Sequence, residues 1–248
     1  MTVVPGLVSV TFRRLGVAEI VALVAGAGLR AVEWGGDVHV PSPPVAREVA
    51  LRCADAGLEI AAYGSYYRGG PGFADVLATA VALGAPRIRV WAGRHGSAAE
   101  PDRAAVVADL ARAAAQAAGE GVEVCLEYHA NTLTDTLEST MELLRAVPAV
   151  RSYWQPPVGD RPATALAAVQ ALRPVTAHVF SWDDAGTRLP LAAGESLWRP
   201  VLGALGELPG TRYALLEFVR DDDPAAFAED AATLLGWLRP EWIDGDQG

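Results

Sequence analysis

Residues 101–127 read PDRAAVVADLARAAAQAAGEGVEVCLE. The first part is rich in alanine and leucine, and its apolar spacing predicts a helix over Pro101–Ala118. Gly119 and Gly121 follow, and a glycine after a helix readily takes the left-handed conformation that ends it. The apolar run Val122–Glu127 then predicts a strand. This stretch therefore predicts one helix that returns through a tight turn into one strand.

The same unit recurs along the whole chain. Strands are predicted at Leu7–Phe12, Arg30–Trp34, Leu58–Tyr63, Arg87–Trp91, Val122–Glu127, Val150–Gln155, Val175–Phe180 and Tyr213–Phe218. Helices are predicted near Val17–Ala27, Pro44–Ala56, Gly72–Leu83, Pro101–Ala118, Thr134–Ala146, Ala163–Leu172, Leu197–Leu208 and Pro224–Leu238. Eight units in 248 residues leave about 31 residues for each. That count and that length indicate an α/β protein folded as a single (β/α)8 TIM barrel.

An open, doubly wound α/β sheet is the alternative fold. Such sheets usually carry a glycine-rich phosphate loop after their first strand. Here the predicted first strand runs into TFRRLG, which contains no GxGxxG pattern. No linker or shift in composition divides the chain, so we expect one barrel domain over residues 1–240 and a frayed tail over residues 241–248.

The bulk composition excludes several classes of protein. A net charge of −10 argues against nucleic-acid binding, which needs a basic surface to neutralise phosphates. All 20 cationic residues are arginine, and without lysine the chain is no Schiff-base aldolase, lysine-anchored PLP enzyme or P-loop NTPase. The chain has neither an apolar run long enough for a membrane span nor a start typical of a signal peptide. We therefore expect a cytoplasmic protein.

Four polar residues lie where four predicted strands end: Glu127, Gln155, His178 and Glu217. The carboxyl ends of barrel strands meet at one rim, so these side chains are expected to converge. Two carboxylates, an imidazole and an amide oxygen suit one divalent ion such as Mn²⁺, Mg²⁺, Co²⁺ or Zn²⁺. Such an ion polarises a substrate carbonyl, and a carboxylate base can then remove a proton from the adjacent carbon. The sequence therefore suggests a metal-dependent isomerase or epimerase.

The order of several motifs carries a family resemblance. These motifs are AVEWGGDVH at residues 31–39, RIRVWAG at 87–93, CLEYH at 125–129, AHVFSWDD at 177–184, AAGESLWRPVL at 192–202 and LLEF at 215–218. Over nearly its whole length the chain resembles the xylose-isomerase-like TIM-barrel superfamily of sugar and sugar-phosphate isomerases and epimerases. Ketose 3-epimerases, hydroxypyruvate isomerases and inosose dehydratases are among its members.

The resemblance also implies roles for individual residues. Glu127, His178 and Glu217 would bind the metal, and the two glutamates would act as the acid/base pair around a metal-bound enediolate. Glu33, His39 and Arg188 would contact the substrate. We add Trp91, His129 and Trp182 as expected substrate contacts, because all three follow strand ends and two are aromatic faces that suit a sugar. Each of these residues also has a plain structural reading, since a histidine or tryptophan at a barrel mouth often only packs.

The chain departs from the family pattern at the sixth strand. The family usually places an aspartate there, often with a histidine three residues later, whereas this chain has Gln155 and Val158. Gln155 is neutral, so the site would hold its ion with one negative charge fewer, or would have lost the ion.

Two alternatives to an isomerase or epimerase therefore stay open. One is a dehydratase of the inosose type, and the other is a metal-free barrel that binds carbohydrate without catalysis. A DNA-repair endonuclease is disfavoured, because the chain has only four histidines and an acidic composition. We expect a small sugar as the substrate and no nucleic-acid or membrane partner, and a homodimer is an open alternative to a monomer.

Overall fold

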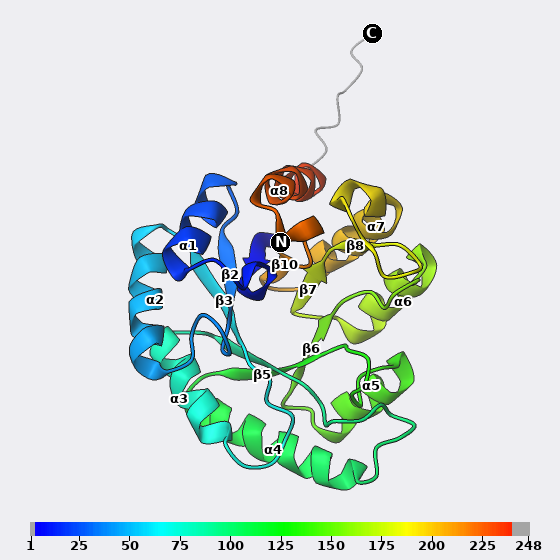
Figure 1. Ribbon diagram of the computed structural model, residues 1–248. Coiled ribbons are helices and arrows are strands. Elements are labelled where there is room, and N and C mark those ends of the chain that lie inside the picture. Colours follow the sequence, from blue (N-terminus) through cyan, green and yellow to red (C-terminus); the bar gives the residue numbers. More distant parts are fainter. Residues whose placement is uncertain (1–2, 240–248) are drawn as a thin grey trace.

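The computed structural model describes residues 3–239. Eight parallel strands close into a barrel, and helices surround it on the outside (Figure 1). The barrel strands are β1 (Val3–Val8), β2 (Ala31–Gly35), β3 (Glu59–Gly64), β4 (Arg87–Val90), β5 (Glu123–Glu127), β6 (Arg151–Trp154), β7 (Thr176–Val179) and β10 (Arg212–Leu216). Each strand pairs with its neighbours in sequence, and β10 closes the barrel against β1. The predicted (β/α)8 TIM barrel is confirmed.

The helices follow the strands as expected. They are α1 (Val17–Gly26), α2 (Pro43–Asp55), α3 (Phe73–Leu83), α4 (Arg103–Gly119), α5 (Leu137–Ala146), α6 (Pro162–Leu172), α7 (Glu195–Glu207) and α8 (Pro224–Leu238). Short 3-10 turns lie at η1 (Ser9–Phe12), η2 (Leu191–Gly194) and η3 (Arg220–Asp222). After β7 the chain forms a small antiparallel hairpin from β8 (Ser181–Trp182) and β9 (Arg188–Leu189).

The prediction for the first strand was wrong. The strand is Val3–Val8, and most of the predicted strand forms the 3-10 turn η1. Pro5 and Gly6 weakened the sequence signal for this strand, because both residue types are uncommon inside strands. Gly6 is required by a close approach: a Cβ there would lie 2.3 Å from the carbonyl oxygen of Ala31 on β2. The residue that weakened the sequence signal for this strand is therefore one that the close packing of β1 and β2 requires.

Side-chain alternation along β4 and β5 determines what enters the barrel. Residues two apart on a strand share one face, which groups Arg87 with Arg89 and Glu123 with Glu127. Arg89 and Glu127 lie at the carboxyl ends of their strands and meet in a buried ion pair. Arg87 and Glu123 lie at the amino ends and meet in a second pair. The barrel therefore holds one charged group at each end of these two strands.

Two further predictions concern the bounds of the barrel domain and the absence of membrane-spanning segments. The domain boundaries stay a prediction, and the tail expected over residues 241–248 lies outside the described residues. Within residues 3–239, none of the helices combines the length and apolar character needed to cross a lipid bilayer.

Candidate active site

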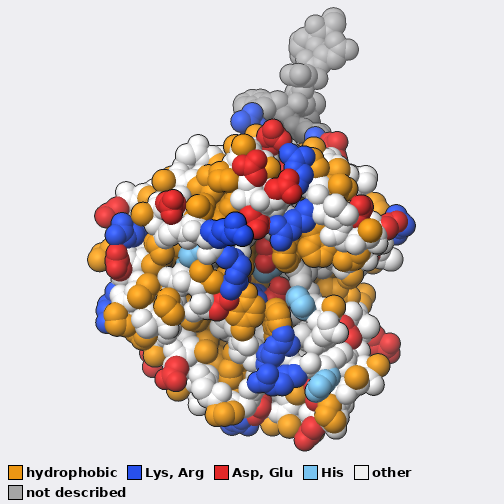
Figure 2. Space-filling model, viewed as in Figure 1, with side chains coloured by type: hydrophobic (Ala, Val, Ile, Leu, Met, Phe, Trp, Pro, Cys, Tyr) orange, Lys and Arg blue, Asp and Glu red, His pale blue; other side chains and the backbone are white. Residues whose placement is uncertain are grey.

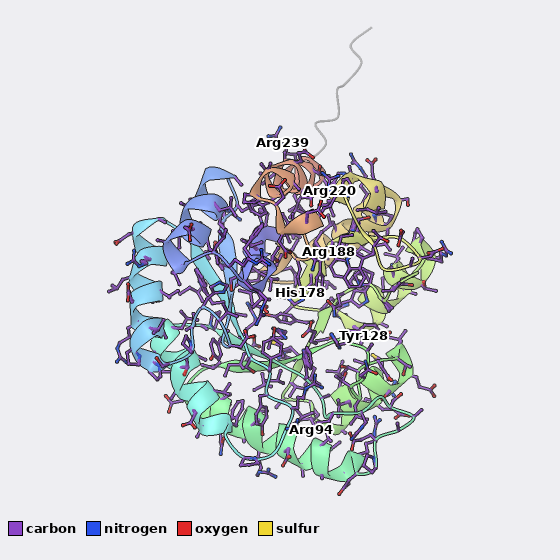
Figure 3. The ribbon with its side chains drawn as sticks, viewed as in Figure 1. Arg94, Tyr128, His178, Arg188, Arg220 and Arg239 are labelled. Atoms are coloured by element: carbon purple, nitrogen blue, oxygen red, sulfur yellow. The ribbon has the colours of Figure 1, made fainter. Side chains whose placement is uncertain are left out.

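Three of the four predicted strand-end residues converge. Glu127 ends β5, His178 lies in β7 and Glu217 follows β10, and one ligand atom from each lies within 4.8 Å of the others. His178 Nδ1 lies 3.2 Å from Glu217 Oε2 and 3.6 Å from Glu127 Oε1. All three side chains are buried. Figure 3 labels His178 near the centre of the barrel, between Arg188 on one side and Arg94 on the other.

Arg89 links this group to Glu33, and sequence reasoning missed it. Its Nε donates to Glu33 Oε1 at 2.9 Å, and its Nη1 donates to Glu127 Oε2 at 2.6 Å. The Trp91 indole N–H also donates to Glu127 Oε2. Arg89 and Glu33 are both fully enclosed in the barrel. The signal was available, because an arginine two residues before the strand-end Trp91 falls on an inward position of β4.

Glu33 fixes the orientation of the histidine. His178 Nε2 lies 3.4 Å from Glu33 Oε2, so an N–H on that nitrogen faces a carboxylate. The other nitrogen, Nδ1, points toward Glu127 and Glu217, where it can donate to a carboxylate when protonated or bind a cation when it is not. The Tyr153 ring meets the imidazole edge-on, with centroids 5.5 Å apart. A carboxylate behind a histidine is the usual arrangement at histidine ligands to metals.

The charges at the site shift the pKa values of its members in opposite directions. Burial raises the pKa of Glu127, but Arg89 and His178 more than offset this and hold it below its usual range. Glu33 shows the same balance. Burial raises its pKa, but the positive charges of His178 and Arg89 lower it by more, so the pKa lies below its ordinary value. Burial lowers the pKa of His178, yet Glu217 and Glu33 raise it well above its ordinary value. The site therefore attracts positive charge, whether a proton on His178 or a cation between the carboxylates.

The atoms that would face an ion lie close together, with few hydrogen bonds from the rest of the protein. His178 Nδ1 and Glu217 Oε2 face each other at 3.2 Å, and Gln155 Oε1 is buried without a hydrogen-bond partner among residues 3–239. Buried polar atoms rarely lack partners, so this oxygen needs an explanation. One nitrogen and several oxygens form a donor set that suits Mg²⁺, Mn²⁺, Co²⁺ or Zn²⁺. Glu127, His178 and Glu217 therefore fit a divalent ion, and Gln155, directly after β6, carries a neutral oxygen of the kind that could join them.

The site opens into a pocket of about 270 Å³ at the barrel mouth. Its lining includes Glu127, Glu217 and Trp91, together with Arg13 and Arg188 from the surrounding loops. Figure 2 shows this face hollowed at its centre, with basic, acidic and histidine side chains gathered around the hollow. The pocket is thus small, charged and open to solvent on one side.

Trp91 forms part of the pocket wall together with cationic and aromatic neighbours. Its ring stacks on the imidazole of His129 at 4.4 Å, and the Arg68 guanidinium lies 3.8 Å from the ring centroid. Arg68 donates to the Gly93 carbonyl and has no carboxylate partner within the described part of the chain. An unpaired cation therefore lies beside the mouth.

A second lobe of about 250 Å³ adjoins the first through His129 and Phe218. It contains Gln155 and Trp182. Phe218 directly follows Glu217 and has a φ of 53°, a left-handed conformation that is a clear outlier for a bulky residue. This conformation directs an aromatic ring to the boundary of both lobes, and no sequence signal marked it.

Two predicted substrate contacts are engaged within the fold. His39 is buried, with Nδ1 3.0 Å from Ser9 Oγ and Nε2 3.2 Å from the Leu15 carbonyl oxygen. Arg188 lies at the mouth but donates to Asp222 at 2.5 Å and to the Val219 carbonyl. Glu33, Trp91, His129 and Trp182 are positioned as described above. Their roles toward a substrate stay predictions, and the complete burial of Glu33 favours a supporting role.

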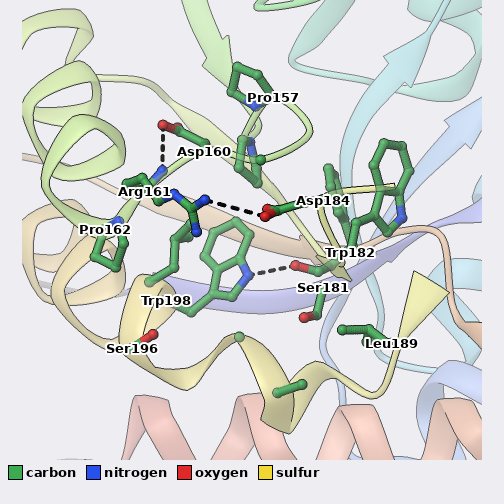
Figure 4. Close-up of a pocket in the computed structure, with 16 residues that line it drawn as sticks. Pro157, Asp160, Arg161, Pro162, Ser181, Trp182, Asp184, Leu189, Ser196 and Trp198 are labelled. Atoms are coloured by element: carbon green, nitrogen blue, oxygen red, sulfur yellow. Dashed lines mark hydrogen bonds and ion pairs between the residues drawn. The ribbon is translucent and has the colours of Figure 1, made fainter. Parts of the chain in front are cut away.

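Another hollow lies outside the barrel mouth, beside the β8–β9 hairpin (Figure 4). The N-terminal ends of α6 and α7 border it, and its cation Arg161 pairs with Asp184 at 3.3 Å. Trp198 donates to the Phe180 carbonyl at its base. None of the converging glutamates or the central histidine reaches it.

Comparison with protein families gives one match over most of the chain. A family described as "Xylose isomerase-like TIM barrel" matches residues 21–240. A comparison with curated proteins found no significant match.

Solved structures of similar shape are numerous but distant in sequence. The probable 3-DHS dehydratase AsbF from Bacillus anthracis, involved in petrobactin synthesis, has a TM-score of 0.80 at 20% identity, covering 94% of this chain and 99% of that one. D-psicose 3-epimerase from Clostridium cellulolyticum H10, solved with D-tagatose, has a TM-score of 0.69 at 16% identity, covering 94% and 97%. A Mycobacterium smegmatis protein of this barrel type, in complex with magnesium, has a TM-score of 0.66 at 19% identity, covering 92% and 90%. At these identities the likeness extends to the fold alone.

Proposed function

The chain belongs to the xylose isomerase-like TIM barrel family, and on that premise we propose that it is a divalent-metal-dependent enzyme acting on a sugar or sugar acid. The proposed reaction moves a proton at the carbon next to a carbonyl, which makes the enzyme an isomerase or an epimerase. The observation that carries the proposal is the convergence of the buried side chains of Glu127, His178 and Glu217, whose ligand atoms lie within 4.8 Å of one another, with Glu33 behind the histidine.

In the proposed site Glu127, His178 and Glu217 hold the ion, and Gln155 adds a neutral oxygen. When bound, the ion would polarise a substrate carbonyl and make the neighbouring C–H acidic. With the ion on Nδ1, Glu33 would accept the Nε2 proton of His178 and so hold the imidazole in place. The mouth pocket is lined by both strand-end glutamates, so a substrate bound there would have its reacting carbon beside them.

The two glutamates are unequal as bases. Glu127 receives hydrogen bonds from Arg89 and Trp91, and these donors stabilise its ionised form. Glu217 has no guanidinium partner within residues 3–239, and its Oε2 lies 3.2 Å from His178 Nδ1. We therefore assign the first proton abstraction to Glu217 and electrostatic support to Glu127.

The cations at the mouth suggest an acidic group on the substrate. Arg68 lies over Trp91, which lines the mouth pocket, and has no carboxylate partner among residues 3–239; Arg13 lines the pocket itself and pairs with Asp37. Guanidinium groups bind carboxylate and phosphate strongly, often through two parallel hydrogen bonds. A sugar acid or a sugar phosphate fits this mouth better than a neutral sugar does.

Dehydration is the second candidate reaction. It would use the same proton abstraction, followed by loss of a hydroxyl from the next carbon. The dehydratase AsbF has a closely similar fold, and an acidic substrate would suit the unpaired Arg68. A metal-free, non-catalytic carbohydrate-binding barrel is less well supported, because three buried titratable side chains would then converge without a ligand to bind.

The test combines metal analysis with isotope exchange. We expect about one divalent ion per purified chain, and deuterium uptake from solvent at the carbon next to the carbonyl of ketoses, keto acids or their phosphates. Water loss from the substrate would identify the dehydratase instead. A protein with neither bound metal nor exchange would contradict both enzyme proposals.

Matched variants separate the site from general effects on folding. Glu217→Gln keeps the size of the side chain, and we expect it to lose exchange. Glu138→Gln makes the same change on an exposed position of α5 and should leave exchange intact. Equal exchange in both variants would exclude Glu217 as the base.

A further inference from the structure

The amino-terminal end of the barrel, opposite the candidate active site, has a pocket of about 600 Å³. Four of its lining residues are arginines, and Glu123 is the one acidic lining residue among those the structure describes. The arginines are Arg87, Arg151, Arg173 and Arg212. Three of them are the first residues of the strands β4, β6 and β10, and Arg173 is the C-cap residue of α6. We call this group the arginine pocket.

The protein neutralises the arginine pocket only in part. Glu123 lies 3.3 Å from Arg87 and 3.4 Å from Arg151, both longer than a strong charge-assisted hydrogen bond. Within residues 3–239, Arg173 has no ion pair, and Arg87 Nη1 and Arg212 Nε are buried without an acceptor. Arg212 donates only to the carbonyl of its neighbour Thr211. The pocket therefore has more donors than the fold supplies acceptors.

Composition does not explain this crowding of cations. The chain has 30 acidic and 20 basic residues, so a random surface pocket would be acidic. Burial, and then the nearby charges of Arg87 and Arg173, lower the pKa of Arg212. A helix C-terminus attracts a single cation, which explains Arg173 but not the other three. An anion bound among the four would relieve their mutual repulsion.

The backbone at Arg173 gives an independent sign. Arg173 caps α6 with a φ of 50°, the left-handed conformation that favours glycine. The same chain uses glycine at the equivalent end of α3, where Gly84 has a φ of 72°. Arginine at this position brings its guanidinium to the pocket at a cost to the end of the helix.

We propose that the arginine pocket binds a phosphate-bearing small molecule, at a site separate from the candidate active site. Phosphate oxygens accept parallel hydrogen bonds from guanidinium groups, and several arginines around one cavity suit a multiply charged anion. The volume lies within the usual range for small-molecule sites. This site does not depend on the reaction catalysed at the opposite end.

Calorimetric titration of the full chain with pyrophosphate tests the proposal. Each titration is run at one fixed ionic strength and is then repeated at a higher salt concentration. We expect saturable binding whose affinity is lower at the higher salt concentration. Arg173→Gln and Arg212→Gln should each lower the affinity about tenfold, because each removes charge-assisted hydrogen bonds. Arg30→Gln is the matched control: Arg30 is exposed at the same end of the barrel, before β2, and lies outside the pocket. Its affinity should equal that of the wild type.

A second variant separates binding from folding. Arg173→Gly suits the left-handed backbone, so we expect its thermal midpoint without ligand to equal or exceed the wild-type value, while pyrophosphate affinity falls. Unchanged affinity in both Arg173 variants would overturn the proposal. If Arg68→Gln loses pyrophosphate binding while Arg173→Gln and Arg212→Gln keep it, the anion binds at the opposite end of the barrel. That result would also overturn the proposal.

Discussion

At the scale of single residues, Arg89 governs the electrostatics of the candidate site. One guanidinium neutralises two fully buried carboxylates, Glu33 and Glu127, and leaves Glu217 without such a partner. Without Arg89, the barrel would hold three acidic groups against one histidine. The arginine therefore makes the glutamates unequal and holds Glu33 in position behind His178.

Replacing Arg89 should strongly destabilise the fold. In Arg89→Leu two buried carboxylates lose their counter-ion, and breaking such a pair costs about 3–5 kcal/mol. Urea denaturation measures the change in free energy of unfolding. The control Arg52→Leu removes a half-exposed pair with Glu48 on α2, and should cost less than about 1 kcal/mol. Similar losses in both variants would contradict the assigned role.

We predict that the neutral side chain of Gln155 weakens the retention of a metal at the site. Gln155→Asp adds one negative charge beside the ion, so we expect divalent-ion affinity to rise about tenfold or more. Competition with a chelator measures the affinity. Gln116→Glu, an exposed change of the same charge on α4, should leave it unaltered. Equal or weaker binding by the aspartate variant would refute this explanation of Gln155.

His39 should make stability depend on pH. Burial lowers the pKa of His39 below the ordinary value of 6.5, and the positive charge of Arg13 lowers it further. The hydrogen bond to the Leu15 carbonyl and the negative charge of Asp37 raise the pKa but do not offset burial. Unfolding therefore takes up a proton below pH 6.5, and the stability that neutral His39 contributes above this pH is lost as the pH falls through its folded pKa.

The measurement compares the free energy of unfolding of His39→Gln and wild type between pH 7 and pH 5. Wild type should lose more stability than the variant over this range. His95→Gln, at an exposed loop histidine, should follow the wild-type curve. Parallel curves for His39→Gln and wild type would exclude the effect.

At the scale of elements, β1 shows how a strand can be determined by its neighbours. Its Pro5 and Gly6 disfavour a strand locally, yet it pairs with both β2 and β10 and closes the barrel. Gly6 permits the close approach to β2. The strand therefore forms because the other seven strands present two free edges to it.

Gly6→Ala should thus be costly. Its Cβ would lie 2.3 Å from a backbone oxygen that side-chain motion cannot relieve, and overpacking of this kind costs about 1–3 kcal/mol. Gly203→Ala makes the same change inside α7 with nothing within 4 Å, and should stabilise the fold by about 0.5–1 kcal/mol. Chemical denaturation measures both, and a neutral Gly6→Ala would contradict the required close approach.

At the scale of the whole molecule, the barrel separates two charged centres. The carboxylate-rich centre faces the mouth, and the arginine pocket occupies the opposite end. Both arise from the same inward face of β4 and β5, through Arg89 with Glu127 and Arg87 with Glu123. The apolar middle of the barrel, with Cys125 and Tyr153, keeps the centres apart.

Metal binding should be linked to the stability of the entire fold. An ion that binds only the folded chain adds about 2.7 kcal/mol at a free concentration of 100 times its Kd. The thermal midpoint of the wild type should rise with added divalent metal. In Glu217→Gln this rise should shrink markedly, and equal rises in both proteins would argue against a metal site at Glu217.

The sequence by itself determined the repeat of helices and strands, the barrel and the strand-end residues Glu127, His178 and Glu217. These features depend on local periodicity and on chain order, which are visible in one dimension. Tertiary structure alone decided that Arg89 bridges Glu33 and Glu127, that His39 is held by Ser9 and Leu15, and that four arginines share one pocket. Barrel closure and strand register bring these residues together across dozens of positions, and no local pattern records that geometry.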